Sequence, residues 1–467
     1  MEKNKMGIKP IPGLITKMAL PVIFSMLIQA LYNVVDSIFV SRVSEEALTA
    51  VSLAFPLQLI VIAAFVGLST GISSAISRKL GEKDHHSAMQ VAQNGLFIAA
   101  VLFAVVAIGG YFSAGPVFNG FSIGRFTYNG FTENQTIITY GITYVKIVML
   151  FSFGSIFTQA GMSVFRGTGD MIKPTISQLI GAILNIILDP ILIFGWGFIP
   201  AMGVKGAAIA TVTAQIISML YIWITLLGGK SIIKLKIKEF KLSMKAIQQI
   251  LVVGIPSAIM QGLASVMLFF MNIILSRFGD SAIAVMGVYF KIQSMVFMPV
   301  FGLSIGTMPV VGYNYGAKNK DRIKKAIKFS ATVAAIYMTL CLVLLQILPA
   351  QLLGMFNASS EMLAIGVPAF RSISLIFPLI AITIILTTAF QAFGKAYYSL
   401  IVSVVRQLVV LIPVAFMLAR YSNVDLVWFA FIIAEVIGLI VVTVLFSNVY
   451  RNSVGGWDVA LEAEVQP

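Results

Sequence analysis

Apolar stretches of 20 or more residues recur along the whole 467-residue chain. Each stretch is long enough to cross the ~30 Å hydrocarbon core of a membrane as a helix. Backbone polar groups in lipid must bond within their own segment, so long apolar runs predict helices rather than the short alternating strands of a β-barrel. Charged residues make up 11% of the chain, against about 25% in soluble domains. We therefore predict an all-α polytopic membrane protein.

We predict twelve transmembrane helices, separated by short polar segments. Their lengths allow tilting or bending but do not specify either. The stretch 114–136, rich in Gly, Phe, Asn and Thr, is predicted to be an outer loop. The predicted spans are residues 14–41, 48–76, 90–113, 137–163, 171–197, 203–228, 247–276, 282–312, 326–349, 362–392, 396–420 and 426–450.

The basic residues are distributed very unevenly between the predicted loops. If the N-terminus is cytoplasmic, 23 Lys and Arg residues fall on the cytoplasmic side and 5 on the outer side. This asymmetry is the usual topology signal of membrane proteins. The net charge of +14 is therefore explained by topology, and we expect no nucleic-acid partner. The pattern predicts a multi-pass protein of the cell (inner) membrane with both termini in the cytoplasm.

The two halves of the chain resemble each other. A shift of 235 residues places Pro21 on Pro256 and the run 67–69 on 302–304, and a shift of 225 places Lys146 on Arg371. Six spans are an even number, so both copies start on the same side of the membrane. A parallel repeat of this kind is typical of transporters, with the substrate site near the midplane.

The repeat predicts two pseudo-symmetric six-helix lobes. We expect an N-terminal lobe at 1–228, a basic cytoplasmic linker at 229–246, a C-terminal lobe at 247–450 and a cytoplasmic tail at 451–467. The linker carries six lysines. A passive channel needs no such two-lobed repeat.

Asp36 is one of three acidic residues inside the predicted spans, and ionisable groups at membrane depth are functional candidates by default. Gln29, Tyr32 and Asn33 lie on the same helical face as Asp36, and we expect them to line a substrate cavity. Pro21, upstream in the same helix, is expected to bend or loosen it. The alternative is a polar stripe that only packs against neighbouring helices.

The second acid, Asp189, lies four residues after Asn185 and shares its helical face. Two carboxylates and an amide in apolar surroundings can replace the water shell of a small hard cation. Alternatively, burial and mutual repulsion can leave one carboxyl carrying a proton. Because Pro190 follows, Asp189 could also be a helix-end residue near the outer face.

The third acid, Glu435, lies in the last predicted span, and Arg406 lies in the span before it. An ion pair between neighbouring helices is the expected way to keep both charges in lipid. A structural role and a transport role for this pair both remain open. Embedded histidines and nucleophile–base motifs are absent from the spans, so we do not expect an enzyme.

Several motifs together resemble one transporter family. They are the run from Phe165 to Asp170, Asn185 to Pro190, Pro21 followed by Asp36, Gly206 to Thr211, and Ser403 to Gln407. This combination resembles the MATE (multidrug and toxic compound extrusion) transporters over nearly the whole chain. The resemblance implies a MATE-like fold of twelve helices in two lobes that works by alternating access.

The resemblance also implies a function and a site. It implies secondary active export of amphipathic organic cations in exchange for Na⁺ or H⁺. It places the coupling cation at Asp36, Asn185, Asp189 and Thr211, and marks Pro21 as the bending position. We expect no cofactor beyond the coupling ion, a monomer in membrane lipid, and small amphipathic cations as ligands. A flippase for a lipid-linked precursor, or an exporter of another amphipathic metabolite, is the alternative.

Overall fold

A computed structural model describes residues 4–123, 126–128, 130–197, 199–229, 231–235, 239–356, 358–421 and 423–455. Most of the predicted tail, residues 456–467, lies outside the described residues, as do 230 and 236–238 of the predicted linker. Residues 451–455 form a short π-helix, η5 (Arg451–Gly455), that continues the last long helix.

The described residues contain ten helical segments that are long and apolar enough to cross a membrane. Nine of them are ordinary helices and one, Ala396–Tyr421, is built from four consecutive segments. The nine are α2 (Ile11–Ser41), α3 (Glu45–Gly81), α4 (His85–Asn119), α7 (Ile172–Phe194), α8 (Gly203–Leu227), α9 (Met244–Leu275, extended to Phe278 by η2, Ser276–Phe278), α10 (Asp280–Gly316), α11 (Lys320–Ile347) and α17 (Val424–Tyr450).

Two further spans are bent pairs of helices. α5 (Gln135–Leu150) and α6 (Phe153–Gly167) meet at 42°, and α13 (Ser360–Ser374) and α14 (Phe377–Ala392) meet at 51°. Counting each pair as one crossing gives twelve spans, so the predicted twelve-helix fold is confirmed. Sequence analysis treated 137–163 and 362–392 as continuous spans and did not predict their bends.

The eleventh span changes its helical type near its middle. α15 (Ala396–Val404) leads into a π-helix, η3 (Val405–Leu411), followed by α16 (Ile412–Leu418) and η4 (Ala419–Tyr421). Pro413 cannot donate to the carbonyl four residues earlier, so a wider helical turn is favoured before it. π-helical turns are frequent at functional sites.

Three small elements complete the described chain. α1 (Lys5–Ile8) precedes the first span, and α12 (Pro349–Gly354) precedes α13. In the predicted outer loop 114–136, α4 continues to Asn119 and a two-stranded antiparallel hairpin follows. Its strands are β1 (Phe121–Ile123) and β2 (Phe126–Tyr128), paired as Phe121↔Tyr128, Ser122↔Thr127 and Ile123↔Phe126.

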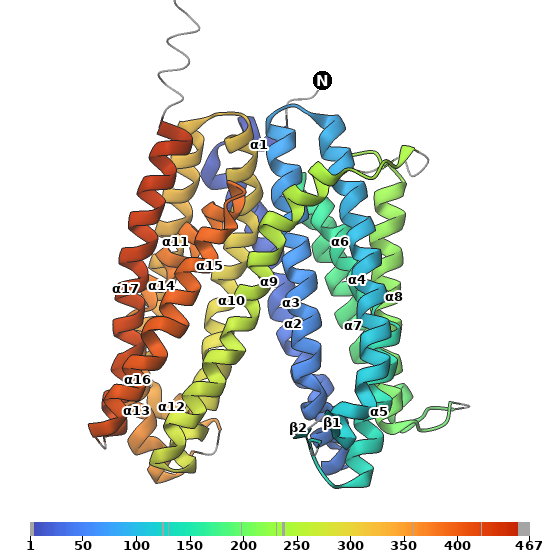
Figure 1. The fold of residues 1–467 in the computed structure, drawn as a ribbon, viewed down its shortest axis with the longest axis vertical. Coiled ribbons are helices and arrows are strands. Elements are labelled where there is room, and N and C mark those ends of the chain that lie inside the picture. The colour runs from blue at the N-terminus through green and yellow to red at the C-terminus, as the bar shows by residue number, and fades with distance from the viewer. Residues whose placement is uncertain are drawn as a thin grey trace, which may run out of the picture. The chain divides into compact units, whose positions relative to one another are not determined.

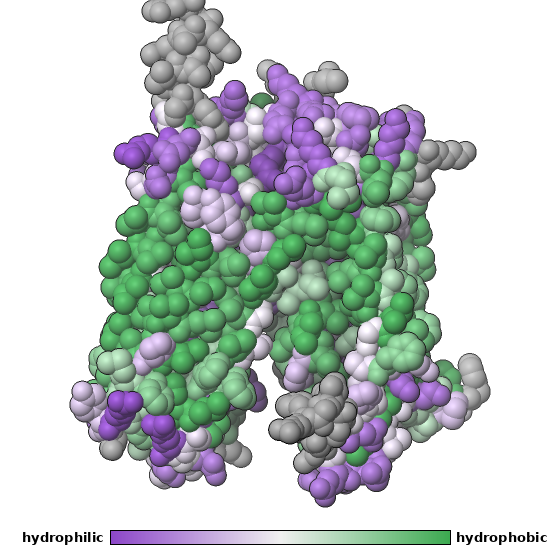
Figure 2. All heavy atoms as spheres, viewed as in Figure 1, coloured by the Kyte–Doolittle hydropathy of each residue, from purple (hydrophilic) through white to green (hydrophobic). Residues whose placement is uncertain are grey.

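The chain divides into two compact units. Unit 2 comprises Phe24–Ile76 and His85–Gly254, and unit 1 comprises Met1–Ile23, Ser77–Asp84 and Ile255–Pro467. The units follow contacts between helices, and they do not test the predicted lobe boundaries, which stay a prediction. In each unit, hydrophobic side chains cover the middle of the helices and hydrophilic residues gather at their ends (Figure 2). This is the surface expected of helices that cross a membrane.

In unit 2, α7 and α8 pack side by side over much of their length (Figure 1). A Cβ atom at Gly206 of α8 would collide with the carbonyl oxygen of Leu192 in α7. Small residues at such contacts let membrane helices approach closely. The close approach brings the polar side chains of α7 and α8 within hydrogen-bonding distance of one another.

Candidate functional site

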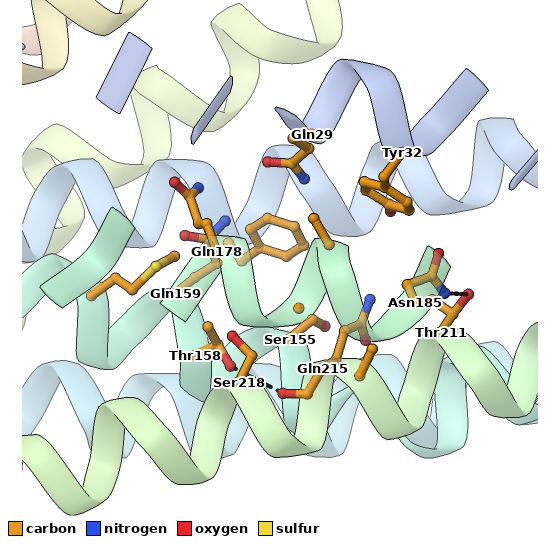
Figure 3. A pocket seen from close by; sticks show the side chains of 15 residues that line it. Gln29, Tyr32, Ser155, Thr158, Gln159, Gln178, Asn185, Thr211, Gln215 and Ser218 are labelled. Atoms are coloured by element: carbon orange, nitrogen blue, oxygen red, sulfur yellow. Dashed lines mark hydrogen bonds between the residues drawn. The ribbon is translucent and has the colours of Figure 1, made fainter. Parts of the chain in front are cut away.

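Unit 2 contains a cavity of about 130 Å³ lined by side chains of α2, α3, α6, α7 and α8 (Figure 3). The lining is rich in amides and hydroxyls, and none of its fifteen residues is charged. Its apolar members are Phe65, Met162 and three small residues. The lining residues are Gln29, Tyr32, Phe65, Ser155, Thr158, Gln159, Met162, Gln178, Gly181, Ala182, Asn185, Thr211, Ala214, Gln215 and Ser218.

Some of the polar side chains around this cavity satisfy one another. Ser25 donates to Gln178 Oε1 at 2.7 Å, and the hydroxyls of Ser177 and Ser218 lie 2.9 Å apart. In contrast, the Oε1 atoms of Gln159 and Gln215 are buried and have no partner within the described part of the chain. Buried polar atoms usually have a partner, so these two oxygens are available to a ligand in the cavity.

One end of the cavity, formed by Asn185 and Thr211, adjoins two carboxyl groups. Asp189 is fully buried and Asn185 is 3% exposed. With its nitrogen turned towards Asp189 Oδ2 (3.1 Å), the Asn185 amide accepts hydrogen bonds from the Thr211 amide and hydroxyl at 3.3 Å each. This orientation satisfies both ends of the amide. Asn185 therefore connects Asp189 on α7 to Thr211 on α8.

Asp36 on α2 approaches the same group of side chains. The carboxyl groups of Asp36 and Asp189 lie within side-chain hydrogen-bonding reach of each other. The other Asp36 oxygen, Oδ1, is buried and has no partner among the described residues. Tyr32 and Tyr144 lie within electrostatic range of both carboxyl groups, and Gln58 donates to the Tyr144 hydroxyl at 3.3 Å.

This arrangement offers oxygen ligands to a small cation. Two carboxylates, the Asn185 carbonyl and the Thr211 hydroxyl are donors that a hard cation prefers. Among the described residues, no cluster of three or more His, Cys, Asp or Glu is present. The donor set therefore combines two acids with neutral oxygens, and the same two acids could instead hold a proton between them.

The structure places most of the predicted first-lobe residues together. Gln29 and Tyr32 line the cavity, whereas Asn33 is exposed and is not among the lining residues. α7 continues through Pro190 to Phe194, so Asp189 is buried inside a helix rather than at its end. α2 also remains helical through Pro21, and a bend at that position stays a prediction.

Apart from Thr211 in α8, sequence reasoning missed the contributions of α6 and α8 to the cavity. Ser155, Thr158, Gln159 and Met162 recur every three or four residues in α6, so they share a helical face. Gln215 follows Thr211 by four residues in α8 in the same way. A search for polar residues at helical spacing in every span would have found both stripes.

Unit 1 contains the predicted charge pair. Arg406 Nη1 in η3 lies 3.2 and 3.1 Å from the two carboxylate oxygens of Glu435 in α17. The Glu435 side chain is 6% exposed and that of Arg406 is 23% exposed. A Cβ at Gly438 would lie 3.2 Å from Arg406 Cδ. The absence of a side chain at Gly438 therefore allows the aliphatic part of Arg406 to pack there. The role of the pair in transport stays a prediction.

Comparison with known proteins decides the family. A sequence model of the MatE family matches residues 21–191 and 256–417. The chain belongs to the MatE family. The two matches start 235 residues apart (256 − 21), the same shift that relates the two halves of the sequence. Membership confirms the predicted resemblance, and it makes the chain a multi-pass membrane transporter rather than an enzyme.

Curated relatives cover most of the chain. The FAD transporter of Shewanella oneidensis is 26% identical over 411 residues, which is 87% of this chain and 88% of that protein. The probable multidrug resistance protein NorM of Thermotoga maritima is 25% identical over 436 residues (91% and 90%). The multidrug export protein MepA of Staphylococcus haemolyticus is 26% identical over 420 residues (90% and 89%).

Solved structures show the same fold. A MOP superfamily transporter from Pyrococcus furiosus has a TM-score of 0.88 and 26% identity, covering 98% of both chains. The outward-facing structure of a multidrug resistance MATE family transporter has a TM-score of 0.88 and 25% identity, covering 97% of this chain and 99% of that one. These likenesses confirm the predicted MATE-like fold.

Proposed function

We propose that this MatE transporter exports amphipathic organic cations in exchange for Na⁺ or H⁺. The observation that carries the proposal is the proximity of two structures on α2, α7 and α8. The Asp36–Asp189 carboxyl pair adjoins the uncharged polar cavity through Asn185 and Thr211. An ion site and a substrate cavity built on the same helices can affect each other directly.

The coupling ion is proposed to bind between Asp36 and Asp189. Two carboxylates so close together repel each other unless a cation or a proton neutralises one of them. If the ion is Na⁺, the Asn185 carbonyl and Thr211 hydroxyl complete its oxygen ligands. The unpartnered Oδ1 of Asp36 supports this assignment because a buried carboxylate oxygen usually has a partner, and a bound cation would supply one.

Coupling is proposed to act through α2. Gln29 and Tyr32 of the cavity lie seven and four residues before Asp36 on this helix. A shift of Asp36 towards a bound ion therefore changes the cavity one and two turns away. Pro21, upstream, is proposed to absorb the bend. Ion and substrate then favour different states of one protein, which is the condition for exchange.

The proposed substrates follow from the chemistry of the site. Phe65 and Tyr32 offer aromatic faces to a cation, and Met162 is a soft side chain that adapts to different shapes. The nearby carboxyl pair adds negative charge. A membrane potential of 100 mV contributes about 2.3 kcal/mol per charge moved, enough to support a substrate gradient of well over tenfold.

We further propose the cellular setting predicted from the loops. The transporter acts as a monomer in the lipid of the cell (inner) membrane, with both termini and the 229–246 linker in the cytoplasm. The two lobes 1–228 and 247–450 alternate access to the site. A flippase for a lipid-linked precursor would need a basic cavity, and the uncharged lining of the described cavity favours the exporter.

Purified protein in liposomes tests this function. The vesicles are loaded with a fluorescent cationic dye, and a sodium gradient and a proton gradient are imposed in separate experiments. Dye movement under one gradient supports the exchanger and names its ion. Movement under neither gradient, in protein that elutes as a folded species, would overturn the proposal and favour a lipid-linked or another amphipathic substrate.

A further inference from the structure

The Arg406–Glu435 pair lies on the fifth and sixth spans of its repeat, and the fifth and sixth spans of the other repeat are among those that line the cavity. α7 and α8 are the fifth and sixth spans of the first half, and η3 and α17 belong to the fifth and sixth spans of the second half. The 225-residue shift places Gly181, a lining residue of the cavity, on Arg406. In a parallel repeat, equivalent positions are expected to face equivalent parts of the transport path.

The Arg406 guanidinium is only partly used. Its Nη1 atom contacts both oxygens of Glu435, and no hydrogen bond is made by Nε or Nη2 to any residue that the structure describes. The side chain is 23% exposed and is not fully enclosed by protein. The free Nε–Nη2 edge is the geometry that binds a carboxylate or a phosphate through two parallel hydrogen bonds.

One polar atom on a neighbouring element also lacks a partner among the described residues. The Tyr289 hydroxyl of α10 lies within electrostatic range of Glu435 and is buried without a hydrogen bond in the described chain. Most buried polar atoms in folded proteins have a partner. A polar ligand beside the pair would supply a partner for the Tyr289 hydroxyl.

A cluster of buried aromatic rings packs beside the pair. The ring of Tyr289 lies 5.7 Å from that of Phe370 and 6.2 Å from that of Phe431. Phe431 is one turn before Glu435 on α17. Arg406 is ten residues into the span Ala396–Tyr421, about 15 Å from its start. At that depth a lipid headgroup is remote, which favours a transported molecule as the source of an anionic group.

We infer that Arg406, oriented by Glu435, is a second substrate site that binds an anionic oxygen group, a carboxylate or a phosphate, on an amphipathic aromatic molecule. The inference rests on the proposed function and extends its substrates from organic cations to zwitterions and anions. The first repeat then supplies an uncharged hydrogen-bonding cavity beside two acids, and the second supplies an arginine.

The test compares two pairs of fluorescent molecules that each differ only in the anionic group. Rhodamine B and its ethyl ester differ in a carboxylate, and riboflavin 5′-phosphate and riboflavin differ in a phosphate. Binding to detergent-purified protein is measured by fluorescence anisotropy, without any ion gradient. The site predicts that at least one acidic member binds about tenfold more tightly than its neutralised partner.

Arg406→Lys keeps the charge but removes the two-pronged edge, so the preference for the acidic member should fall about tenfold. The double variant Arg406→Gln/Glu435→Gln removes both charges together and should abolish the preference. It provides an independent test if the lysine variant does not fold. Arg371→Lys, another in-span arginine of unit 1, serves as the matched control. The Nε of Arg371 donates to the Gln346 carbonyl at 3.3 Å. Arg371→Lys should leave the preference for the acidic member unchanged in both fluorescent pairs.

A preference in the rhodamine pair alone identifies a carboxylate ligand, and one in the flavin pair alone identifies a phosphate. Equal binding within both pairs by the unaltered protein would overturn the inference. So would preferences that persist in both Arg406 variants. Failure of gradient-driven dye transport bears only on the proposed exchange, because binding is measured without a gradient.

Discussion

The carboxyl group of Asp36 on α2 lies within hydrogen-bonding reach of the carboxyl group of Asp189 on α7, and Asp36 Oδ1 is buried without a partner in the described chain. Asp189 itself is fully buried. Two acids held together in apolar surroundings are unfavourable unless something positive joins them. The pair is therefore the place in unit 2 where we expect a cation or a proton to bind.

The first prediction concerns Asp36. Asp36→Asn keeps the shape of the side chain but removes its charge, so ion-driven dye transport in liposomes should fall by more than about tenfold. Expression and melting temperature should stay close to those of the unaltered protein because a buried charge has been removed. Glu361→Gln, an exposed acid of α13, is the control. Near-normal coupled transport by Asp36→Asn would exclude Asp36 from the mechanism.

The second prediction concerns the Thr211 hydroxyl, which donates to Asn185 and is proposed as an ion ligand. Thr211→Val has nearly the same shape without the oxygen, and the ion concentration for half-maximal transport should rise about tenfold. Thr211→Ser keeps the hydroxyl and should differ little from the unaltered protein. Titration of transport rate with Na⁺ and with pH measures both variants. Equal ion affinities of the Thr211→Val and Thr211→Ser variants would show that the hydroxyl is not a ligand.

The number of spans could be predicted from sequence because each span needs about 20 apolar residues. The breaks at Phe151–Ser152 and Leu375–Ile376 could not. Pro378, at the start of α14, accounts locally for the second break. The first has no proline nearby, so packing against neighbouring helices decides it. The hairpin that follows α4 could not be predicted either, because strands of three residues carry no period that distinguishes them from a loop.

The acids of the site could be predicted because a charge within a span is costly and therefore conspicuous. Gln159 and Gln215 were missed because a single glutamine in an apolar helix is tolerable, and only the tertiary arrangement shows that both face one cavity. Asn33 stays a predicted cavity residue. It lies near the predicted polar face of α2, but a helical face is broad, and Asn33 is not among the residues that line the described cavity with Gln29 and Tyr32.

The third prediction concerns the close approach of α7 and α8. Gly206→Ala would place a methyl group against the Leu192 carbonyl, forcing the helices apart at a cost of about 1–3 kcal/mol. The melting temperature should fall by several degrees, and ion affinity should fall because Asn185 and Thr211 separate. Gly262→Ala in α9, where the added atom meets nothing within 4 Å, should leave both unchanged. An unaltered ion affinity in a destabilised Gly206→Ala protein would show that the site does not depend on this contact.

The fourth prediction concerns Gln215, whose Oε1 is buried and unpartnered among the described residues. Gln215→Leu should raise the KM for a hydrogen-bonding cationic dye about tenfold, because a substrate contact is lost. It should not destabilise the protein, since no internal hydrogen bond is broken. Dye titrations in liposomes and a thermal melt measure the two effects. Gln351→Leu, on the exposed side of α12, is the control, and an equal rise in KM for that variant would contradict the assignment.

The last prediction concerns the stability of the Arg406–Glu435 pair. Glu435→Gln leaves a partly buried arginine without its partner, and removing one member of such a pair costs about 3–5 kcal/mol when burial is complete. Arg406 is 23% exposed, so the loss should be at the lower end of this range and visible as a lower melting temperature. Arg406→Leu/Glu435→Leu removes both charges and should recover most of the loss, because replacing both members of a buried ion pair with apolar residues is often neutral or stabilising. A double variant as unstable as Glu435→Gln would show that the two charges do not stabilise each other.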